Sequence, residues 1–320
     1  MTANLLSLLV CPSCSSCLRH DPAIGRESLT CGSCGQRVPI INGIPRFVDR
    51  IEDPLARKTQ ASFGYEWTHF KDWRNSGEIN FSDYFAGVDL RSLNNAVVLD
   101  AGCGMGRHAR QIAPHARQVV AVDFSEAIDQ AARNVEGQPN VDCVQADLLA
   151  LPLADSSCDF VYSLGVLHHL AETEKAIAGL VRKLRPGGRL RIYLYWKRHG
   201  WSGMLLQMVT AARRITTRLP FPLLRALCWL LSAGLFVLVT LPYRALSKLG
   251  VRWHRDWPLF VYAKYPFAVL YNDQFDRFSA PIEKRYDPDE VQRLLEGAGL
   301  RDVCIRRSFG WIADGIKPAC

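Results

Sequence analysis

The sequence contains no repeat and no low-complexity tract, and it lacks the low hydrophobicity that accompanies disorder. Its 320 residues are 48% hydrophobic and 22% charged, so we expect a folded protein with one large domain and room for a smaller one. No Lys or Arg precedes the short apolar run Leu5–Val10, which argues against an export signal. The large side chain of Val10 also argues against a lipoprotein cleavage site at Cys11. We therefore expect a cytoplasmic protein.

Basic residues outnumber acidic ones, and the net charge of +8 suggests at first a nucleic-acid partner. The excess, however, is confined to one segment. Residues 197–286 hold fourteen Lys or Arg and four acidic residues, an imbalance larger than that of the whole chain. The basicity is therefore a property of this segment and not a general sign of nucleic-acid binding.

Four of the eleven cysteines form two Cys-x-x-Cys pairs, Cys11 with Cys14 and Cys31 with Cys34. Two such pairs separated by sixteen residues are typical of a tetrahedral four-thiolate zinc site, and they indicate a reducing compartment. Four thiolates leave no open position for water or substrate, so we expect the zinc ion to be structural. Cys17 is a spare thiol and an alternative to Cys14.

The segment around these cysteines, residues 1–48, is too small to bury enough surface alone, so zinc binding would supply the missing free energy of folding. It ends in the run Val38–Pro45, which reads VPIINGIP. In its cysteine spacing and in this run, the segment resembles the zinc-ribbon domain of tRNA-methyltransferase activator proteins. The resemblance implies a small ribbon fused ahead of a larger domain.

Short β-branched runs alternate with helical stretches from about Ala96 onward, the pattern of a parallel sheet covered by helices on both faces. The fold class that we expect is α/β, a doubly wound Rossmann-like sheet with a small amino-terminal zinc ribbon and a helical apolar insertion. A Pro-Gly-Gly run at residues 186–188 should separate a helix from the following strand. The expected strands are residues 97–100, 118–123, 141–145, 160–163, 189–196 and 303–307, and the expected helices include 125–135, 172–184 and 287–297.

A glycine-rich turn follows the first expected strand, with Gly102, Gly104 and Gly106 after Asp100. Such turns let the backbone approach a ligand closely, although they also occur for conformational reasons alone. About twenty residues further along, the second strand ends at Asp123, whose carboxylate is placed to accept hydrogen bonds from ribose hydroxyls. A helix cap is the alternative role of this aspartate.

Two further strand ends lie at the same edge of the expected sheet. Asp147 and Leu148 follow the third strand, near the expected position of an adenine ring, and a simple turn residue is the alternative role of Asp147. Ser163 ends the fourth strand. Ligands of open α/β sheets bind at these carboxyl ends, so the side chains that follow them are candidates for ligand contact. We also assign Phe124 to the cofactor site.

With these motifs, residues 95–196 and again 286–310 resemble the class I S-adenosylmethionine-dependent methyltransferases, specifically the group of ubiquinone and menaquinone biosynthesis methyltransferases. The resemblance implies S-adenosylmethionine as the cofactor. A dinucleotide is the alternative ligand, but its turn normally reads Gly-x-Gly-x-x-Gly, and here the third glycine comes one residue early. The contacts implied by the resemblance are the methionine part with Asp100 and the three glycines, the ribose with Asp123, the adenine with Asp147 and Leu148, and the sulfonium side with Ser163.

Methyl transfer to a phenol or alcohol needs a proton acceptor, and histidine suits this role near neutral pH. His168 and His169 follow the fourth strand at the cofactor edge, and we expect at most one of them to reach the acceptor. A hydrogen bond to the loop backbone is the alternative role. The aromatic segment Phe63–Phe70 is a candidate lid over donor and acceptor, or else a packed linker between the ribbon and the sheet.

An insertion, residues 197–286, separates the fifth strand from the next helix. Within it, Ala226–Tyr243 carries no charge over eighteen residues, the threshold length for a membrane-spanning helix. A single span would put strands of one sheet on opposite sides of the bilayer, and basic residues flank both ends. We therefore expect residues 219–262 to make peripheral contact with the inner face of a membrane through basic and aromatic side chains. A buried cap or a dimer interface is the alternative.

The motifs and the resemblance together predict a methyltransferase with a small-molecule or lipid-linked acceptor, methylated at oxygen or carbon. An RNA methyltransferase that uses the ribbon and the basic insertion is less favoured, since no RNA-recognition aromatic signature is present. A donor-binding scaffold without catalysis is the third alternative. The expected units are a zinc ribbon (1–48), lid or linker helices (49–94), the cofactor-binding core (95–196), the insertion (197–286) and a carboxyl-terminal helix with strands that complete the sheet (287–320).

Overall fold

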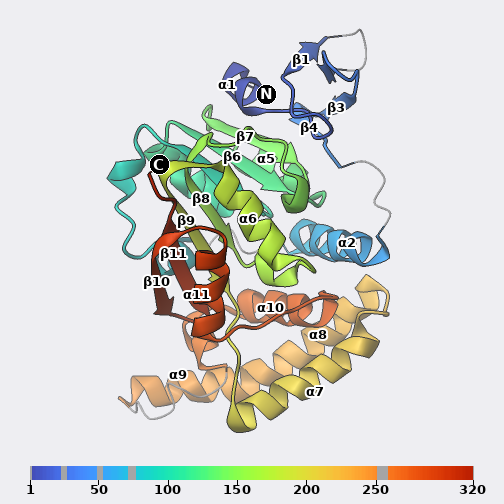
Figure 1. The fold of residues 1–320 in the computed structure, drawn as a ribbon. Coiled ribbons are helices and arrows are strands. Elements are labelled where there is room, and N and C mark those ends of the chain that lie inside the picture. Colours follow the sequence, from blue (N-terminus) through green and yellow to red (C-terminus); the bar gives the residue numbers. More distant parts are fainter. Residues whose placement is uncertain (1, 23–26, 49–52, 71–76, 251–258, 320) are drawn as a thin grey trace.

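The computed structural model describes residues 2–22, 27–48, 53–70, 77–250 and 259–319. Figure 1 shows three parts: a small amino-terminal domain at one end, a central α/β body, and a layer of helices at the opposite end. The body is a doubly wound α/β sheet, so the fold class predicted from the alternation of strands and helices is confirmed.

Seven strands form the central sheet in the order β10-β11-β9-β8-β5-β6-β7 (Figure 1). From β9 to β7 all neighbours run parallel, and β11 runs antiparallel to both β9 and β10. The chain proceeds from β5 to one side and returns through β8 on the other, so a ligand-binding switch point lies at the carboxyl ends of β5 and β8. The strands are β5 (Val97–Ala101), β6 (Gln118–Asp123), β7 (Val141–Gln145), β8 (Cys158–Leu164), β9 (Leu184–Leu194), β10 (Arg301–Arg307) and β11 (Trp311–Ile316).

Hydrophobic clusters cover both faces of the sheet, because successive side chains of a strand point to opposite sides. In β5, Val97, Leu99 and Ala101 belong to one cluster and Val98 to the other. Helices α6 and α11 complete the first cluster, and α4 and α5 complete the second. The helical segments of the body are α3 (Gly77–Tyr84), η2 (Leu90–Leu93), α4 (Arg107–Ile112), η3 (Ala113–His115), α5 (Ala127–Asn134), η4 (Leu148–Ala150), η5 (Leu167–His169), α6 (Thr173–Lys183) and α11 (Pro288–Gly297).

Two strands differ from the predicted pattern. Strand β9 begins at Leu184 rather than at residue 189, so the Pro-Gly-Gly run lies inside the strand and does not precede it. The pairing of β8 with β9 shifts register between Cys158 and Phe160, and this irregularity accommodates the run. Strand β11 lies in the segment 287–320, where strands completing the sheet are expected, but no predicted strand range matches it, because its Asp314 and Gly315 are residue types that are depleted in strands.

The amino-terminal domain is a ribbon that packs directly on the central sheet. Its buried side chains Leu5, Leu29 and Val38 belong to the same hydrophobic cluster as Val144 and Leu153 of the body. The two parts therefore share one core, although they are separate in sequence. The ribbon consists of α1 (Ala3–Leu8), β1 (Leu18–Asp21), β2 (Ser28–Cys31), β3 (Arg37–Ile41) and β4 (Ile44–Pro45).

The end of the ribbon lies along β7, the edge strand of the sheet. The backbone N–H of Phe47 donates to the carbonyl of Gln145 over 2.8 Å, and Arg46 forms a parallel bridge with Gln145. The Arg46 guanidinium also pairs with Asp129 of α5 at 2.6 Å. The ribbon thus protects an edge whose backbone groups would otherwise stay open to pairing with another chain.

The insertion is helical, as the sequence predicts. Its helix α10 is the inner layer and packs on α2, where the Asn272 side-chain amide donates to Glu66 over 2.9 Å and the hydroxyl of Ser62 donates to that of Ser279 over 2.8 Å. Helices α7 and α8 form the outer layer (Figure 1). Helix α2 (Pro54–His69) precedes the sheet in the sequence. The helical segments of the insertion are α7 (Gly200–Thr216), α8 (Phe221–Leu235), η6 (Phe236–Thr240), α9 (Leu241–Lys248), η7 (Phe260–Lys264) and α10 (Phe267–Ser279).

A buried ion pair joins β9 to β11. Arg191 is fully buried and donates to the two oxygens of Asp314 over 2.7 and 2.8 Å, and a third nitrogen donates to the carbonyls of Tyr84 and Ala86. Removal of one partner leaves an uncompensated buried charge, so we expect Asp314→Ala to lower the free energy of unfolding in urea by about 3–5 kcal/mol. The exposed Glu136→Ala serves as the control, and an equal effect of both substitutions would contradict this role.

Candidate functional site

The glycine turn begins where β5 ends, at the carboxyl edge of the sheet. Gly102, Gly104 and Gly106 have positive φ angles of 85°, 53° and 74°, a conformation that side chains disfavour. A Cβ at Gly102 would lie 2.4 Å from a methyl group of Val166, and one at Gly104 would lie 3.2 Å from the Trp67 indole. The turn therefore needs glycine for its backbone conformation and for the space beside it.

Asp123 ends β6 beside this turn. One carboxylate oxygen accepts a hydrogen bond from the backbone N–H of Gly104 over 2.8 Å. The other accepts from the N–H and the hydroxyl of Ser125 over 2.8 and 2.7 Å. Burial raises the pKa of Asp123, and the hydrogen bonds from Ser125 oppose that shift. Asp123 thus accepts hydrogen bonds from the segment that leads into α5, a contact like that of its alternative role as a helix cap. It also holds the glycine turn in place.

Asp100 precedes the turn at the end of β5 and is 3% exposed. Among the described residues, its Oδ2 atom has no hydrogen-bond partner. Burial raises the pKa of this carboxyl to about 7, a shift that the Tyr162 hydroxyl opposes. An orphaned carboxylate oxygen at the base of a glycine turn fits a ligand that brings a hydrogen-bond donor or a positive charge.

The raised pKa of Asp100 makes stability depend on pH. Between its unfolded pKa of about 4 and its folded pKa of about 7, the folded state binds a proton that the unfolded chain releases, so stability falls as pH rises. Asp100→Asn removes this loss. We expect the free energy of unfolding of the variant, measured in urea, to rise relative to that of the natural chain by on the order of 2 kcal/mol between about pH 5 and pH 8. A difference that does not change with pH would contradict the shift.

Three further predicted cofactor residues lie at the same edge. Asp147 follows β7, and its carboxylate accepts a hydrogen bond from the N–H of Leu149 over 2.9 Å, the turn-type contact that is its alternative role. Leu148 beside it is buried. The carbonyl of Phe124 accepts a hydrogen bond from the Gln60 side chain of α2 over 3.0 Å. These residues come from β6 and β7, which are neighbours in the sheet, so the edge gathers them near the glycine turn.

A cavity of about 1710 Å³ opens between this edge and the insertion. It is larger than the roughly 300–1,000 Å³ of a pocket for one small ligand. Arg107, directly after the glycine turn, lines it, whereas the predicted cofactor residues do not. Leu164 and Gly165, directly after β8, form the part of its wall nearest the sheet edge. The rest of the wall includes Phe63, Glu66 and Trp67 of α2, Tyr193 and Tyr195 near the end of β9, and residues of α7, α8 and α10.

Helix α2 contains most of the aromatic segment that the sequence marks as a lid or linker. Trp67 lies over Gly104, and the Arg107 guanidinium lies 5.5 Å from the centre of the Trp67 ring. Phe63 and Glu66, one turn earlier, line the cavity. The segment therefore contacts both the glycine turn and the cavity, as the lid hypothesis requires, while its packing on α10 gives it a structural role as well.

The structure places Ser163 and the two predicted histidines behind the cavity wall. Ser163 is fully buried, and its hydroxyl donates to the carbonyl of Ala101 over 2.8 Å. His168 is fully buried, and this burial lowers its pKa well below the usual range. His169 is 2% exposed, and its Nδ1 lies 2.7 Å from the carbonyl of Ile282. A backbone contact of this kind is the alternative role that the sequence allows.

Five acidic side chains line the cavity instead: Glu66, Asp83, Asp273, Asp276 and Glu283. Burial, with the nearby charge of Asp276, raises the pKa of Glu66 well above its usual range, and burial raises the pKa of Asp273 to about 6. One oxygen of Asp276 accepts a hydrogen bond from the Tyr195 hydroxyl over 3.1 Å. Its other oxygen lies 3.9 Å from Nε2 of His169. Asp276 is thus the group that connects His169 to the cavity.

Sequence reasoning did not identify these acids, nor a group of arginines on another part of the wall. Arg198 and Arg307 lie with their guanidinium carbons 4.2 and 4.5 Å from the centre of the Trp196 ring. A usable signal existed for Asp273 and Asp276, since they are two of only four acids in the basic segment 197–286. No such local signal marks the arginines, because the segment is rich in them throughout.

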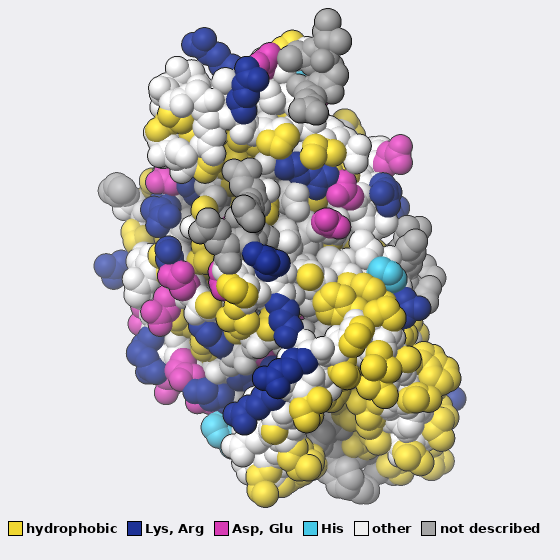
Figure 2. Space-filling model, turned by 90° about the vertical axis from the view of Figure 1, so that its right-hand side faces the viewer, with side chains coloured by type: hydrophobic (Ala, Val, Ile, Leu, Met, Phe, Trp, Pro, Cys, Tyr) yellow, Lys and Arg dark blue, Asp and Glu magenta, His cyan; other side chains and the backbone are white. Residues whose placement is uncertain are grey.

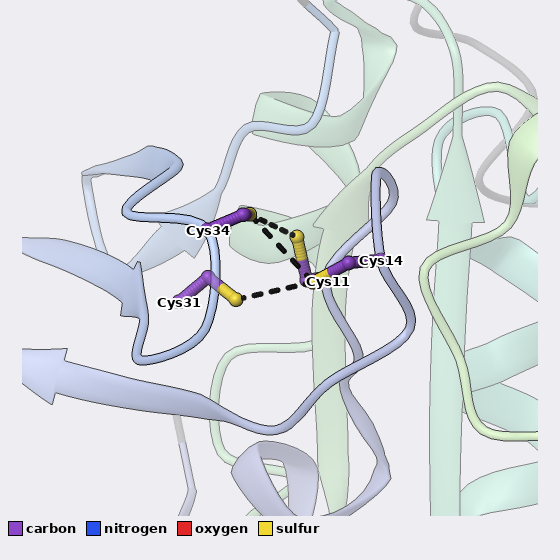
Figure 3. A group of neighbouring side chains, drawn as sticks. All are labelled: Cys11, Cys14, Cys31 and Cys34. Carbon is purple, nitrogen blue, oxygen red and sulfur yellow. Dashed lines mark hydrogen bonds between the residues drawn. The ribbon is translucent and has the colours of Figure 1, made fainter.

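The four predicted zinc ligands come together in the ribbon (Figure 3). Their sulfur atoms lie within 4.8 Å of one another, with contacts of 3.4 Å between Cys14 and Cys31 and 3.5 Å between Cys11 and Cys34. A tetrahedral zinc ion with bonds of about 2.3 Å needs sulfur atoms about 3.8 Å apart, so the donor set fits. Cys17 lies outside this group.

Comparisons with known sequences agree with this site. Residues 99–192, from β5 to β9, match the sequence profile of the methyltransferase domain. A probable S-adenosylmethionine-dependent methyltransferase of Mycobacterium tuberculosis is 42% identical over 96 residues, which are 30% of this chain and 34% of the relative. Demethylmenaquinone methyltransferase of Clavibacter sepedonicus is 36% identical over 96 residues, 30% of this chain and 39% of the relative. The chain thus spans a little over a third of the length of these curated relatives.

Among solved structures, the chain is similar to one in the complex of the Trm112 methyltransferase activator of Haloferax volcanii. The TM-score is 0.51 at 14% identity, and the likeness covers 81% of this chain and 97% of that chain. At this identity the likeness concerns the fold. It extends well beyond the stretch that matches in sequence.

Proposed function

We propose that the chain is an active class I S-adenosylmethionine-dependent methyltransferase, because residues of its central sheet match the methyltransferase domain. In this proposal the acceptor is a small molecule or is lipid-linked, and it is methylated at oxygen or carbon. One observation carries the proposal. The glycine turn, held by Asp123 and backed by the unpartnered Oδ2 of Asp100, lies beside a large cavity that Arg107, directly after the turn, also lines.

The residues around the turn fit the donor. The open backbone of the glycine turn and the buried carboxylate of Asp100 would hold its methionine part, whose ammonium group is a hydrogen-bond donor. Asp123 would accept from the ribose hydroxyls, and Asp147 with Leu148 and Phe124 would contact the adenine. Ser163 is bonded within the sheet, so we leave it out of this set.

When bound, S-adenosylmethionine would supply a methyl group on a positively charged sulfur, which an acceptor atom could displace with loss of the carbon–sulfur bond. The chain's own contribution is to align the two molecules and to exclude water, for which the cover of α2 over the turn is suited. An acceptor hydroxyl must also lose its proton. We propose that Asp276 accepts it, with the Tyr195 hydroxyl and His169 holding that carboxylate in place from behind.

Asp276→Asn tests this assignment. With the acceptor that the assay below identifies, we expect kcat to fall by about 100-fold or more, the usual contribution of a general base, while donor affinity stays unchanged. His169→Gln, which alters a positioning residue, should lower kcat less and shift its pH profile. Unchanged kcat in Asp276→Asn would move the proton acceptor elsewhere.

We propose that the ribbon holds a structural zinc ion through Cys11, Cys14, Cys31 and Cys34. The sulfur positions suit a tetrahedral site, and a site of four thiolates has no open position for chemistry. In this proposal, the metal acts on folding only. It closes a ribbon whose side chains Leu29 and Val38 belong to the core of the catalytic body.

The outer helices of the insertion expose an unusual amount of apolar surface. On α7, Trp201, Met204, Met208 and Ile215 are 60–68% exposed, and their spacing puts them on one face of the helix. Figure 2 shows hydrophobic side chains gathered at the end of the molecule where α7 and α8 lie, with Lys and Arg side chains beside them. Exposed apolar patches rimmed by positive charge suit a surface of anionic lipid headgroups.

The helix Phe221–Lys248 is, in the described part of the chain, long and apolar enough to cross a membrane. One side of it packs on α10, however, and Leu224, Cys228 and Ser232 are buried on α8. Residues 251–258 of the predicted contact segment lie outside the described residues. We therefore propose that this helix lies on the membrane surface rather than across it. Sedimentation with vesicles of phosphatidylglycerol tests the contact, and failure to sediment would favour a buried cap or a dimer interface.

The function itself is tested by transfer of a labelled methyl group from S-adenosylmethionine to total lipid, polar-metabolite and RNA extracts. We expect label in a lipid or a small molecule with the natural chain and none with Asp123→Ala. Label in RNA alone would favour the RNA alternative. Donor binding without transfer to any extract would favour the non-catalytic scaffold.

A further inference from the structure

The arginines around Trp196 form a patch of unbalanced positive charge in the cavity wall. Arg198 and Arg307 both lie against the Trp196 ring and line the cavity, and in the described part of the chain neither has an ion-pair partner. Burial and the neighbouring guanidinium groups of Arg285 and Arg307 lower the pKa of Arg198. Like charges held this close together are stabilised when an anion joins them.

The carboxylate in this part of the wall is already shared. The Glu283 side chain is 2% exposed, accepts a hydrogen bond from Arg285 over 2.9 Å and forms an ion pair with Arg213, whose nearest nitrogen lies 2.6 Å away. One carboxylate thus serves two guanidinium groups and leaves Arg198 and Arg307 uncompensated. Arg285 also donates to the backbone carbonyl of Trp196 over 3.3 Å, which fixes it beside the other two. Arg198 and Arg307 thus bring the donors of an anion site, and among the described residues no anionic side chain is paired with either of them.

Another part of the cavity wall is apolar and reaches the surface. It is lined by Leu205, Leu206 and Val209 of α7 and by Leu231 and Leu235 of α8. Leu205 and Leu231 are also 48% and 41% exposed. These two side chains therefore belong both to the cavity and to the exposed apolar surface of α7 and α8. An apolar chain can pass from that surface into the cavity without leaving apolar contacts.

We propose that Arg198, Arg307 and Arg285 bind an anionic group of the acceptor, and that the acceptor is an amphiphile whose apolar chain lies between α7 and α8. This inference rests on the proposed function and names the substrate class for that site. A phosphate or a carboxylate suits the planar donors of arginine, and the apolar chain explains why the cavity opens toward an exposed hydrophobic face.

Calorimetric binding of dodecyl phosphate, below its critical micelle concentration, tests the inference without any need for the natural acceptor. Inorganic phosphate and the uncharged dodecyl glucoside are the comparison ligands. The test variant is Arg198→Gln with Arg307→Gln. The control is Arg293→Gln with Arg301→Gln, which removes the same charge from two exposed arginines outside the cavity. Binding of S-adenosylmethionine is measured in parallel on every variant.

We expect dodecyl phosphate to bind the natural chain and the control equally and the test variant at least tenfold more weakly. Equal binding to test and control variants would overturn the arginine site. If inorganic phosphate bound as tightly as dodecyl phosphate, the proposed contact with an apolar chain would be wrong. If dodecyl glucoside bound as tightly, the proposed contact with an anionic group would be wrong. If the natural chain did not bind S-adenosylmethionine, that result would refute the proposed function. Binding of dodecyl phosphate would still test the arginine site.

Discussion

Removal of zinc is expected to lower the midpoint temperature of thermal unfolding of the whole chain by about 10–20 °C. The ribbon would lose its metal-dependent fold, and the side chains that it contributes to the shared core, among them Leu29 and Val38, would leave Val144 and Leu153 uncovered. A loss of about 5 kcal/mol is a conservative share of the binding energy of a structural zinc ion, and each kcal/mol shifts the midpoint by about 2–4 °C. Calorimetry with and without a chelator measures the shift.

Two cysteine variants separate zinc binding from other effects of the chelator. Cys31→Ser removes a buried ligand and should reproduce the chelator's shift without any chelator present. Cys17→Ser changes an exposed cysteine of the same ribbon that lies outside the four-sulfur group, so it should leave the midpoint unchanged. If the chelator and Cys31→Ser left the midpoint unchanged, as Cys17→Ser should, that result would contradict a core shared between ribbon and sheet.

Gly102→Ala should both destabilise the fold and abolish donor binding. The new Cβ would lie 2.4 Å from a methyl group of Val166, and it would stand on a residue whose φ is 85°. Backbone strain of about 1–3 kcal/mol and overpacking of about 1–3 kcal/mol together predict a loss of about 2–6 kcal/mol in the free energy of unfolding. Any relief of the clash moves the turn, so S-adenosylmethionine affinity should fall by at least tenfold.

The two causes can be measured separately. Gly137→Ala introduces the same strain at a φ of 87°, but no atom lies within 4 Å of the new Cβ, so its cost is that of the backbone alone. Val166→Ala removes the clashing methyl groups and should recover part of the stability of Gly102→Ala in a double-mutant cycle. A Gly102→Ala variant that is no less stable than Gly137→Ala would show that the contact with Val166 is unimportant.

Local patterns in the sequence are sufficient to predict the parallel strands of the sheet and the glycine turn. The apolar run of β5, the glycines after it and Asp123 at the end of β6 are each readable within a few residues, because strand period and turn chemistry act over that range. The position of β11 was not readable. Its strand character comes from pairing with β9, where Arg191 is held by Asp314, and not from the propensities of its own residues.

The acceptor side of the site depends on packing between distant segments. Glu66 and Asp276 are separated by more than 200 residues, and only the packing of α10 on α2 brings them to one cavity. His169 illustrates the converse. Its place after β8 is a local property that the sequence predicts, but the rings of Phe63 and Tyr195 pack around it and keep it behind the wall. Periodicity predicts the strand or helix to which a residue belongs and does not predict which residues face a cavity.

Calorimetric titration of S-adenosylmethionine into the purified, zinc-loaded chain tests the central claim most directly, with Asp123→Ala as the variant. Asp123 holds Gly104 in the turn and is the proposed ribose ligand, so its loss affects the donor site in both ways. We expect the natural chain to bind one S-adenosylmethionine and the variant to bind at least tenfold more weakly. A natural chain that binds no donor, or a variant that keeps full affinity, would contradict the assignment of the glycine turn and Asp123 as the donor site.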